Sequence, residues 1–292
     1  MSYSIRCVVP SKAKVGESPV WCAEEQALYW VDILEPAIYR LDTITGAIQH
    51  WKMPTQIGSI GLCEQGGAIV ALRTGFHLFD FDTAKLTFIG DPEAHLPMTR
   101  FNDGKVSPDG RFWVGTMDDR LDKQPVGALY RLDPDLTWHT CLTGLRGSNG
   151  LAWSPDGCTM YHSDSRVGSI HTYDYDLMTG TIANQTLFTE QTMISGRPDG
   201  AAVDVEGYYW SAGVSSGVLN RWSPTGQLDQ QIPLPCIAPT MPCFGGPDLK
   251  TIYITSLTHN RPPEKLATKP LSGGLFAFEV EVSGVPIAKF KK

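Results

Sequence analysis

The sequence of 292 residues lacks any run of apolar residues long enough to span a membrane. Its first 21 residues, MSYSIRCVVPSKAKVGESPVW, lack the basic start and the long apolar stretch of a secretion signal. No block of like charges is present and the net charge is only -7, which argues against a nucleic-acid or polybasic membrane-binding surface. We therefore expect a cytoplasmic protein whose partner is a small polar or anionic molecule, in an oligomeric state that the sequence leaves open.

Paired cysteines and paired histidines are missing as well. The seven cysteines are odd in number, widely scattered and without a CxxC pair, so we expect reduced thiols rather than disulfides or a cysteine zinc site. The seven histidines form no HExxH motif. The stretch GVSSG (213–217) matches a nucleophile elbow on paper, but it falls between two expected strands instead of before a helix. Neither a serine hydrolase nor a histidine-based zinc hydrolase is indicated.

The sequence does contain an internal repeat. RFNDGKVSPDGRFW (100–113) returns as SNGLAWSPDGCTMY (148–161), and four further copies align with them. The residues that head the six copies follow one another at spacings of 42, 43, 47, 50 and 42, and they are Glu17, Ser59, Asn102, Asn149, Asp199 and Met241. A period of this size is typical of solenoids and propellers.

Each copy consists of short runs rich in Val, Ile and aromatic residues, separated by Gly, Pro and Asp turns, with no amphipathic helical pattern of useful length. Four strands of about five residues with their turns occupy roughly 40–45 residues, which is one propeller blade. We predict an all-β, six-bladed β-propeller that forms a single domain over residues 1–292. The N-terminal YSIRCVV and the C-terminal GLFAFEVEV should pair to close one blade. The alternative, a β-sandwich followed by a second small domain, is disfavoured by the regular spacing.

In a propeller, the same position of every blade lies at one end of the central tunnel. Here that position carries Glu17, Asn102, Asn149 and Asp199. Two carboxylates and an amide that converge in a dry cavity repel one another unless a cation lies between them. Oxygen ligands suit calcium, magnesium or manganese, and zinc is also compatible. The alternative is that these residues cap turns, as Asn and Asp often do.

Five phrases together resemble the senescence marker protein/gluconolactonase family, whose members include regucalcin and bacterial sugar lactonases. They are GESPVW, RFNDGKVSPDGRFWVGTM, SNGLAWSPDG, RPDGAAVD and CFGGPDLKTIYITS, and the resemblance covers almost the whole chain. It implies a six-bladed propeller that holds one divalent metal ion in its tunnel and hydrolyses sugar lactones. The implied metal ligands are Glu17, Asn149 and Asp199.

The resemblance also implies substrate-binding residues. Arg100 and Asn102 match the family's hydroxyl-binding pair, and Asp103 follows in the same motif. After GTM, where vertebrate members place an acidic residue near the substrate, this chain reads DDRLDKQPVG. That departure puts Arg120 at the aligned position with Asp119 beside it, so both are candidate substrate-binding residues. Arg120 either favours an acidic substituent on the sugar or is a solvated loop charge.

The resulting hypothesis is metal-dependent opening of a sugar lactone to the aldonic acid. Asp199 is expected to serve both as a ligand and as the general base, because one oxygen can bind the ion while the other accepts a proton from water. One alternative is a calcium-binding regulatory propeller without physiological catalysis. Another is a metal-dependent aryl-ester or phosphoester hydrolase. The sugar and the native metal stay open.

Overall fold

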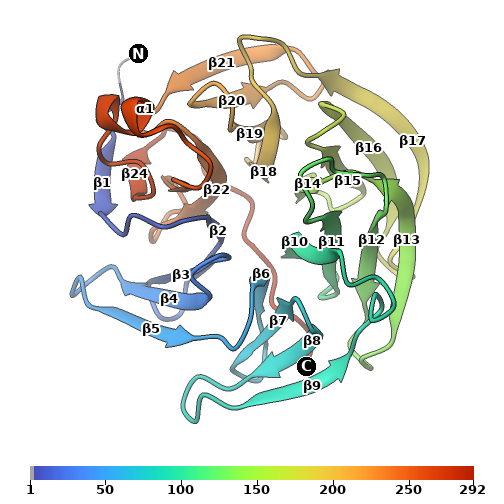
Figure 1. Ribbon diagram of the computed structural model, residues 1–292. Coiled ribbons are helices and arrows are strands. Elements are labelled where there is room, and N and C mark those ends of the chain that lie inside the picture. Colours follow the sequence, from blue (N-terminus) through green and yellow to red (C-terminus); the bar gives the residue numbers. More distant parts are fainter. Residues whose placement is uncertain (1–2) are drawn as a thin grey trace.

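The computed structural model describes residues 3–292 and consists of six four-stranded antiparallel sheets set around a central axis (Figure 1). The predicted six-bladed β-propeller is therefore confirmed. The only helix within residues 3–292 is the short α1 (Pro263–Thr268), which buries none of its residues. None of the helical structure in this part of the chain has the length and apolar character needed to cross a membrane.

The strands in chain order are β1 (Arg6–Val9), β2 (Gly16–Cys22), β3 (Ala27–Asp32), β4 (Ala37–Asp42), β5 (Ile48–Lys52), β6 (Ile57–Leu62), β7 (Ala68–Leu72), β8 (Gly75–Phe79), β9 (Leu86–Gly90), β10 (Thr99–Val106), β11 (Phe112–Asp118), β12 (Gly127–Leu132), β13 (Trp138–Leu145), β14 (Ser148–Trp153), β15 (Thr159–Asp164), β16 (Ser169–Asp176), β17 (Thr181–Glu190), β18 (Pro198–Val203), β19 (Tyr209–Gly213), β20 (Val218–Trp222), β21 (Leu228–Pro233), β22 (Pro239–Gly245), β23 (Thr251–Ser256) and β24 (Leu275–Glu279). Blades 1 to 5 are β2–β5, β6–β9, β10–β13, β14–β17 and β18–β21, and blade 6 is β22–β24 with β1.

Blade 6 closes the ring as predicted from the two ends of the sequence. β1 is its outermost strand and pairs antiparallel with β24, with Arg6 opposite Ala277 and Cys7 opposite Phe276. Just before β1, the ring of Tyr3 packs on that of Phe278 at a centroid distance of 5.2 Å. The first strand thus covers an edge of β24 that would otherwise offer unpaired backbone groups to another chain.

Burial changes from the axis outward within each blade. All residues of the inner strand β2 and of its neighbour β3 are buried, whereas the outer strand β5 has none that are fully buried. The second strands of blades 1, 3 and 5 each contribute a tryptophan that is at most 1% exposed: Trp30, Trp113 and Trp210. Large aromatic side chains therefore fill the space where neighbouring sheets face each other.

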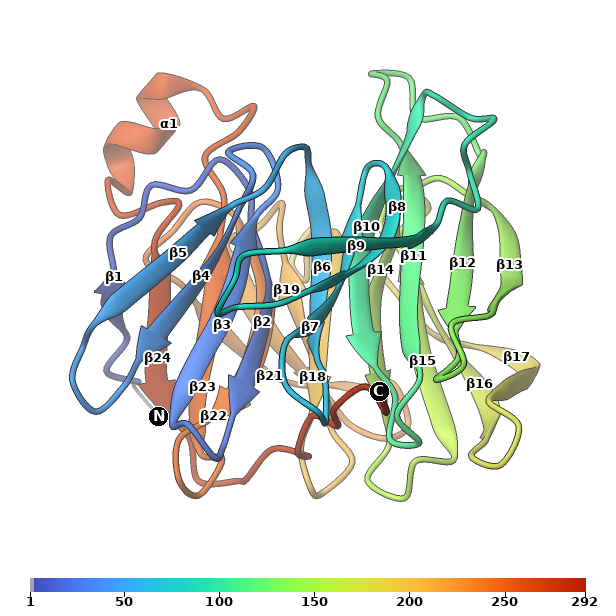
Figure 2. The ribbon, with the colours of Figure 1, turned by 90° about the horizontal axis from the view of Figure 1, so that it is seen from below.

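The two ends of the tunnel differ. The C-terminal segment crosses the end where the inner strands finish, and its backbone bonds to three different blades: Val285 N donates to Val203 O at 2.9 Å, Phe290 N to Leu62 O at 2.7 Å and Lys291 N to Gly110 O at 3.0 Å. Figure 2 shows this segment on the opposite side of the ring from α1. The end where the inner strands begin, here called the mouth, is the side that the C-terminal segment leaves uncovered.

Candidate functional site

All six inner strands carry a β-bulge at the same position, close to the residue that heads each repeat. The pairing register shifts between Glu17 and Val20, Ile57 and Ser59, Phe101 and Gly104, Asn149 and Ala152, Pro198 and Ala201, and Pro239 and Pro242. A bulge locally twists a strand and re-aims its side chains. The repeated phrase therefore encodes a bulge that turns each head residue at the mouth.

The glycines of two of these motifs allow the inner strands to approach each other. A Cβ atom added at Gly200 would lie 2.4 Å from the Cβ of Met241, and one added at Gly104 would lie 2.4 Å from the Oγ of Ser59. Real Cβ atoms do not come so close, so only glycine fits between these strands. The close approach explains why a glycine follows both Asp103 and Asp199.

Three acidic side chains converge at the mouth. Burial raises the pKa of Glu17 well above its ordinary value, and the negative charges of Asp199 and Asp103 raise it further. Burial likewise raises the pKa of Asp199 to about 7, while Arg197 lowers it and Asp103 raises it. Burial also raises the pKa of Asp103, whose buried Oδ1 has no hydrogen-bond partner within the described residues. The three carboxylates are thus near enough to oppose one another's ionisation.

A chain of hydrogen bonds connects the amide residues of blades 3 and 4. Asn102 Nδ2 donates to Asn149 Oδ1 at 3.2 Å and to Ser148 O at 3.0 Å. Asn149 Nδ2 donates to Ser165 Oγ at 2.9 Å. Arg100 Nη1 donates to Asn102 Oδ1 at 2.9 Å. The structure therefore brings together Arg100, Asn102 and Asn149, with each amide group oriented by its neighbours.

The two acidic residues after GTM have different partners. Asp119 accepts from Arg100 Nε at 3.2 Å and from Arg73 Nη1 at 2.7 Å, which places it beside the substrate-binding candidates. Arg120 instead turns back onto Asp118, donating from Nε at 2.9 Å and from Nη2 at 2.9 Å. The Arg120 side chain is 48% exposed and makes no hydrogen bond to Arg100 or Asn102. The structure groups Asp119 with the site residues but not Arg120.

Sequence reasoning assigned no role to several charged residues that surround this site. Lys105 is buried, donates from Nζ to Ala201 O and lies near enough to lower the pKa of Asp103. Arg197 and Arg261 both lower the pKa of Asp199. Arg197 directly precedes the PDG motif and could have been noticed there. Arg261 lies in the loop between β23 and α1, residues 257–262, which no repeat matches, so nothing in the sequence pointed to it.

The donor set fits a hard divalent cation. Glu17, Asn149 and Asp199 offer only oxygen atoms, and the raised pKa values of the two acids show that their negative charges lack compensation at this position. Within residues 3–292, no three His, Cys, Asp or Glu side chains form a metal-binding group by themselves. A three-ligand set at the mouth therefore needs an oxygen from another kind of residue, and the amide of Asn149 offers one.

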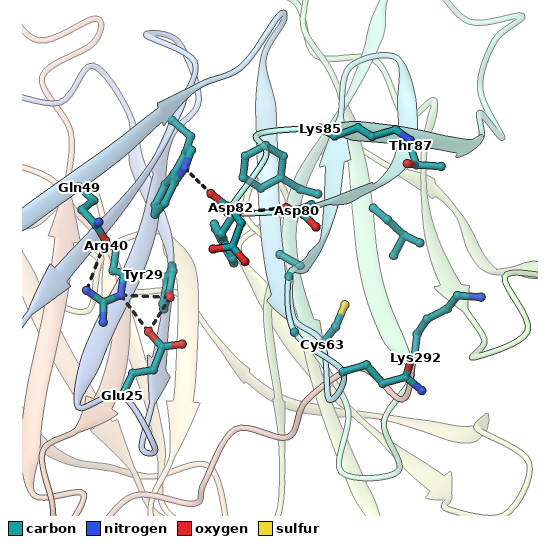
Figure 3. A pocket seen from close by; sticks show the side chains of 18 residues that line it. Glu25, Tyr29, Arg40, Gln49, Cys63, Asp80, Asp82, Lys85, Thr87 and Lys292 are labelled. Carbon is teal, nitrogen blue, oxygen red and sulfur yellow. Dashed lines mark hydrogen bonds and ion pairs between the residues drawn. The ribbon is translucent and has the colours of Figure 1, made fainter.

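A separate hollow of about 940 Å³ lies between blades 1 and 2, away from these residues (Figure 3). On one wall, Glu25 accepts from Tyr29 Oη at 2.8 Å and from Arg40 Nε at 2.9 Å. Lys292 of the C-terminal segment lines the other side. None of the candidate site residues lines this hollow, and Glu25, one of its three acids, is already engaged by Tyr29 and Arg40.

With the geometry established, comparison with known proteins decides the family. The model of the SMP-30/gluconolactonase/LRE-like region matches residues 15–258. The chain belongs to this family. The matched range includes every inner strand and all the residues discussed above at the mouth except Arg261.

Individual relatives agree with this membership. The 6-deoxy-6-sulfogluconolactonase of Pseudomonas putida is 43% identical over 286 residues, covering 97% of each chain. Regucalcin of Xenopus laevis is 35% identical over 280 residues, covering 94% of each chain. Among solved structures, a regucalcin from Agrobacterium tumefaciens, described as a calcium-binding protein, superimposes with a TM-score of 0.95 at 26% identity and covers 100% of this chain and 99% of its own.

Proposed function

We propose that this protein hydrolyses a sugar lactone to the corresponding aldonic acid at the mouth of the tunnel, with one divalent metal ion held by Glu17, Asn149 and Asp199. The observation that carries the proposal is the convergence of Glu17, Asp103 and Asp199, acids whose ionisation is opposed by desolvation and by one another. A relative that is 43% identical across nearly the whole chain is named as a lactonase, which supports the same activity here.

The reaction adds water to the lactone carbonyl carbon, breaks the bond from that carbon to the ring oxygen and leaves a carboxylic acid and a hydroxyl group. A bound divalent ion supplies Lewis acidity and positive charge for the developing oxyanion. Asp199 accepts the proton of the attacking water, because one of its carboxylate oxygens can hold the ion while the other faces the water. The proton then passes to the departing ring oxygen.

The remaining residues position the sugar. Arg100 and Asn102 already fix each other through the 2.9 Å hydrogen bond from Nη1 to Oδ1, so neither must be ordered when substrate binds. Asp119 holds the Arg100 guanidinium from the other side at 3.2 Å. We assign Arg100 and Asn102 to the sugar hydroxyls and Asp119 to the orientation of Arg100.

A second candidate function is calcium binding without turnover. It is supported by the oxygen-only donor set and by similarity to regucalcins, one of which is described as a calcium-binding protein. The two candidates share the metal ligands and differ only in catalysis. Turnover of a lactone therefore separates them.

The test is a panel of aldonolactones hydrolysed in weakly buffered solution, with acid release followed by pH-stat titration. Protein stripped of metal is compared with the same protein restored with calcium, zinc, manganese or magnesium. We expect hydrolysis above the spontaneous rate only after metal is restored. Metal binding seen by calorimetry without hydrolysis of any lactone would leave the calcium-binding function and refute the lactonase.

A further inference from the structure

Three arginines near the mouth have no carboxylate partner within the described residues. Arg166, Arg197 and Arg261 form no ion pair within 4.0 Å and donate no side-chain hydrogen bond, unlike Arg73 and Arg100 across the mouth. The Nε of Arg261 is also buried without an acceptor. A guanidinium left in this state retains several donors for an oxyanion.

Blade topology brings the three arginines to the same end of the molecule. Arg166 follows the end of β15 in blade 4, Arg197 directly precedes β18 in blade 5, and Arg261 lies in the loop after β23 in blade 6. Inner strands begin at the mouth and the antiparallel second strands end there, so all three loops border it. Figure 1 shows β14, β18 and β22 as consecutive inner strands around the axis.

Local contacts hold these loops in place. Ser165 Oγ donates to Pro198 O, which ties the loop of Arg166 to the strand that follows Arg197. The backbone N–H of Arg197 donates to Ser215 Oγ at 2.8 Å, and its carbonyl accepts from Val214 N at 3.0 Å. This role explains Ser215 without any catalytic function for the GVSSG stretch.

The three positive charges act on one another. After burial, the next cause that lowers the pKa of both Arg166 and Arg261 is the charge of Arg197. Asp199 attracts Arg166 and Arg261, and Asp164 also attracts Arg166, but the three guanidiniums outnumber these carboxylates and Asp199 is assigned to the metal. Like charges held near one another at a partly exposed site lack a counter-charge, which an anionic ligand would supply.

Building on the proposed lactonase function, we propose that Arg166, Arg197 and Arg261 form a subsite for an anionic substituent of the sugar lactone, remote from the reacting carbonyl. Planar guanidiniums bind the oxygens of sulfonate, carboxylate or phosphate in a bidentate manner. The name of the Pseudomonas putida relative specifies a sulfo group at position 6 of its lactone, which fits a substituent of this class. Arg120 is less suited to this role because Asp118 already engages its guanidinium.

The experiment compares kcat/KM for three lactones: gluconolactone, 6-deoxy-6-sulfogluconolactone and an aldonolactone with a carboxylate at carbon 6. The variants are Arg197→Gln and Arg261→Gln, with Arg6→Gln as the matched control, since Arg6 also forms no ion pair with any described residue but lies in the outermost strand β1. Each mouth variant should lower kcat/KM for the anionic lactones about 10-fold, because one charge-assisted hydrogen bond is lost. The ratio of kcat/KM for the anionic lactones to that for gluconolactone should therefore fall about 10-fold in each mouth variant, whatever change both share through Asp199, and Arg6→Gln should match the wild type on all three.

Binding of 6-deoxy-6-sulfogluconate, the unreactive ring-opened acid, is measured in parallel by calorimetry. The subsite is refuted, while the lactonase function stands, if two results are found together. The wild type must hydrolyse gluconolactone as efficiently as the anionic lactones, and the mouth variants must lower kcat/KM by the same factor for all three substrates. If no lactone is hydrolysed, the function fails, and about 10-fold weaker binding of the acid to Arg261→Gln than to Arg6→Gln still supports the subsite. Equal binding to both variants refutes it. A preference for sulfonate over carboxylate, or the reverse, identifies the anion.

Discussion

Two buried carboxylates in blade 1 show how neighbours decide what an acid does in this fold. Asp32, opposite Gly16 across the β2–β3 pair, accepts hydrogen bonds from four backbone N–H groups at 2.8–3.2 Å. Glu17 is the next residue along β2 and accepts only one within the described residues, from Ser18 N at 2.9 Å. The hydrogen bonds of Asp32 to these backbone groups hold the neighbouring loops in place. Glu17 keeps an oxygen available for a ligand.

The contrast extends around the ring. Asp32, Asp118 and Asp164 each end the second strand of their blade, and each accepts backbone N–H groups from the loops nearby. The side chain of Arg120 lowers the pKa of Asp118, whereas burial raises that of Asp199 to about 7. Acids in the first group are engaged by backbone N–H groups of the fold, and acids in the mouth are destabilised as anions until a cation compensates them.

Metal removal is expected to have the largest effect on activity, and it tests the difference between the two groups of acids. A chelator should reduce lactone hydrolysis to the spontaneous rate, and a restored divalent ion should recover it, because only the mouth acids require an external cation. Metal at about 100 times its Kd should also add about 2.7 kcal/mol of stability, seen as a higher Tm. Full activity in metal-free protein would show that the mouth acids need no cation, and the proposed difference between the two groups of acids would be wrong.

The second prediction concerns Asp32, whose carboxylate accepts four backbone hydrogen bonds. Asp32→Ala should leave several buried N–H groups without an acceptor and reduce the free energy of unfolding by about 3 kcal/mol. For a chain of this size, Tm should fall by roughly 5–10 °C in a calorimetric scan. The kcat of the protein that remains folded should be unchanged at a temperature well below Tm. A large loss of kcat without a loss of Tm would show that Asp32 belongs to the site.

Asp199→Asn should instead lower kcat without lowering Tm. It keeps the size and one ligating oxygen but removes the charge and the basic lone pair, so kcat should fall by at least about 10²-fold with metal saturating. Tm of the metal-free protein should not fall, because desolvation and the charge of Asp103 both oppose the ionisation that this substitution removes.

Glu17→Gln serves as the matched control for this variant. A residue that only holds the ion loses activity through weaker metal binding, so excess metal should restore much of its rate. If excess metal also restores Asp199→Asn to near wild-type turnover, Asp199 is a ligand without a role in proton transfer.

The ring could be predicted from the sequence because its information is local and repeated. The turns, the aromatic second strands and the glycine after Asp103 and Asp199 recur in successive copies, so six weak patterns reinforce one another. Closure by β1 and β24 was also predictable, since each end reads as a strand without a partner in its own repeat. The segment after β24 could not be predicted, because its bonds to Val203, Leu62 and Gly110 join blades distant in sequence.

The site was predictable to a smaller extent. Position within the repeat pointed to the head residues, but it carries no information on which charges pair across the mouth. Arg120 aligned with a substrate-binding position, yet the structure pairs it with Asp118 two residues away, and it is Asp119 that reaches Arg100. Arg261 lies outside every repeat and nears Asp199 only through the fold.

The smallest expected loss of stability comes from substituting Arg120, the exposed ion-pair partner of Asp118. Asp118 also accepts from the backbone of Arg120 at 3.0 Å and of Gln124 at 2.8 Å, so Arg120→Gln removes only part of its support. The Tm at pH 7 should fall by no more than about 2 °C, because the Arg120 end of the pair is exposed to solvent and Asp118 keeps its backbone donors.

The pH dependence of this small loss tests its cause. Arg120 holds the pKa of Asp118 below its ordinary value in the folded protein, so the pair contributes stability above the unfolded pKa of about 3.9 and loses it as the pH falls further. Melting curves of the wild type and Arg120→Gln should therefore differ at pH 7 and converge in strong acid, where Asp118 is protonated in both. A difference that persists unchanged in acid would mean that Arg120 acts through packing of its aliphatic stem, and the backbone N–H groups of Arg120 and Gln124 would then be the partners that lower the pKa of Asp118.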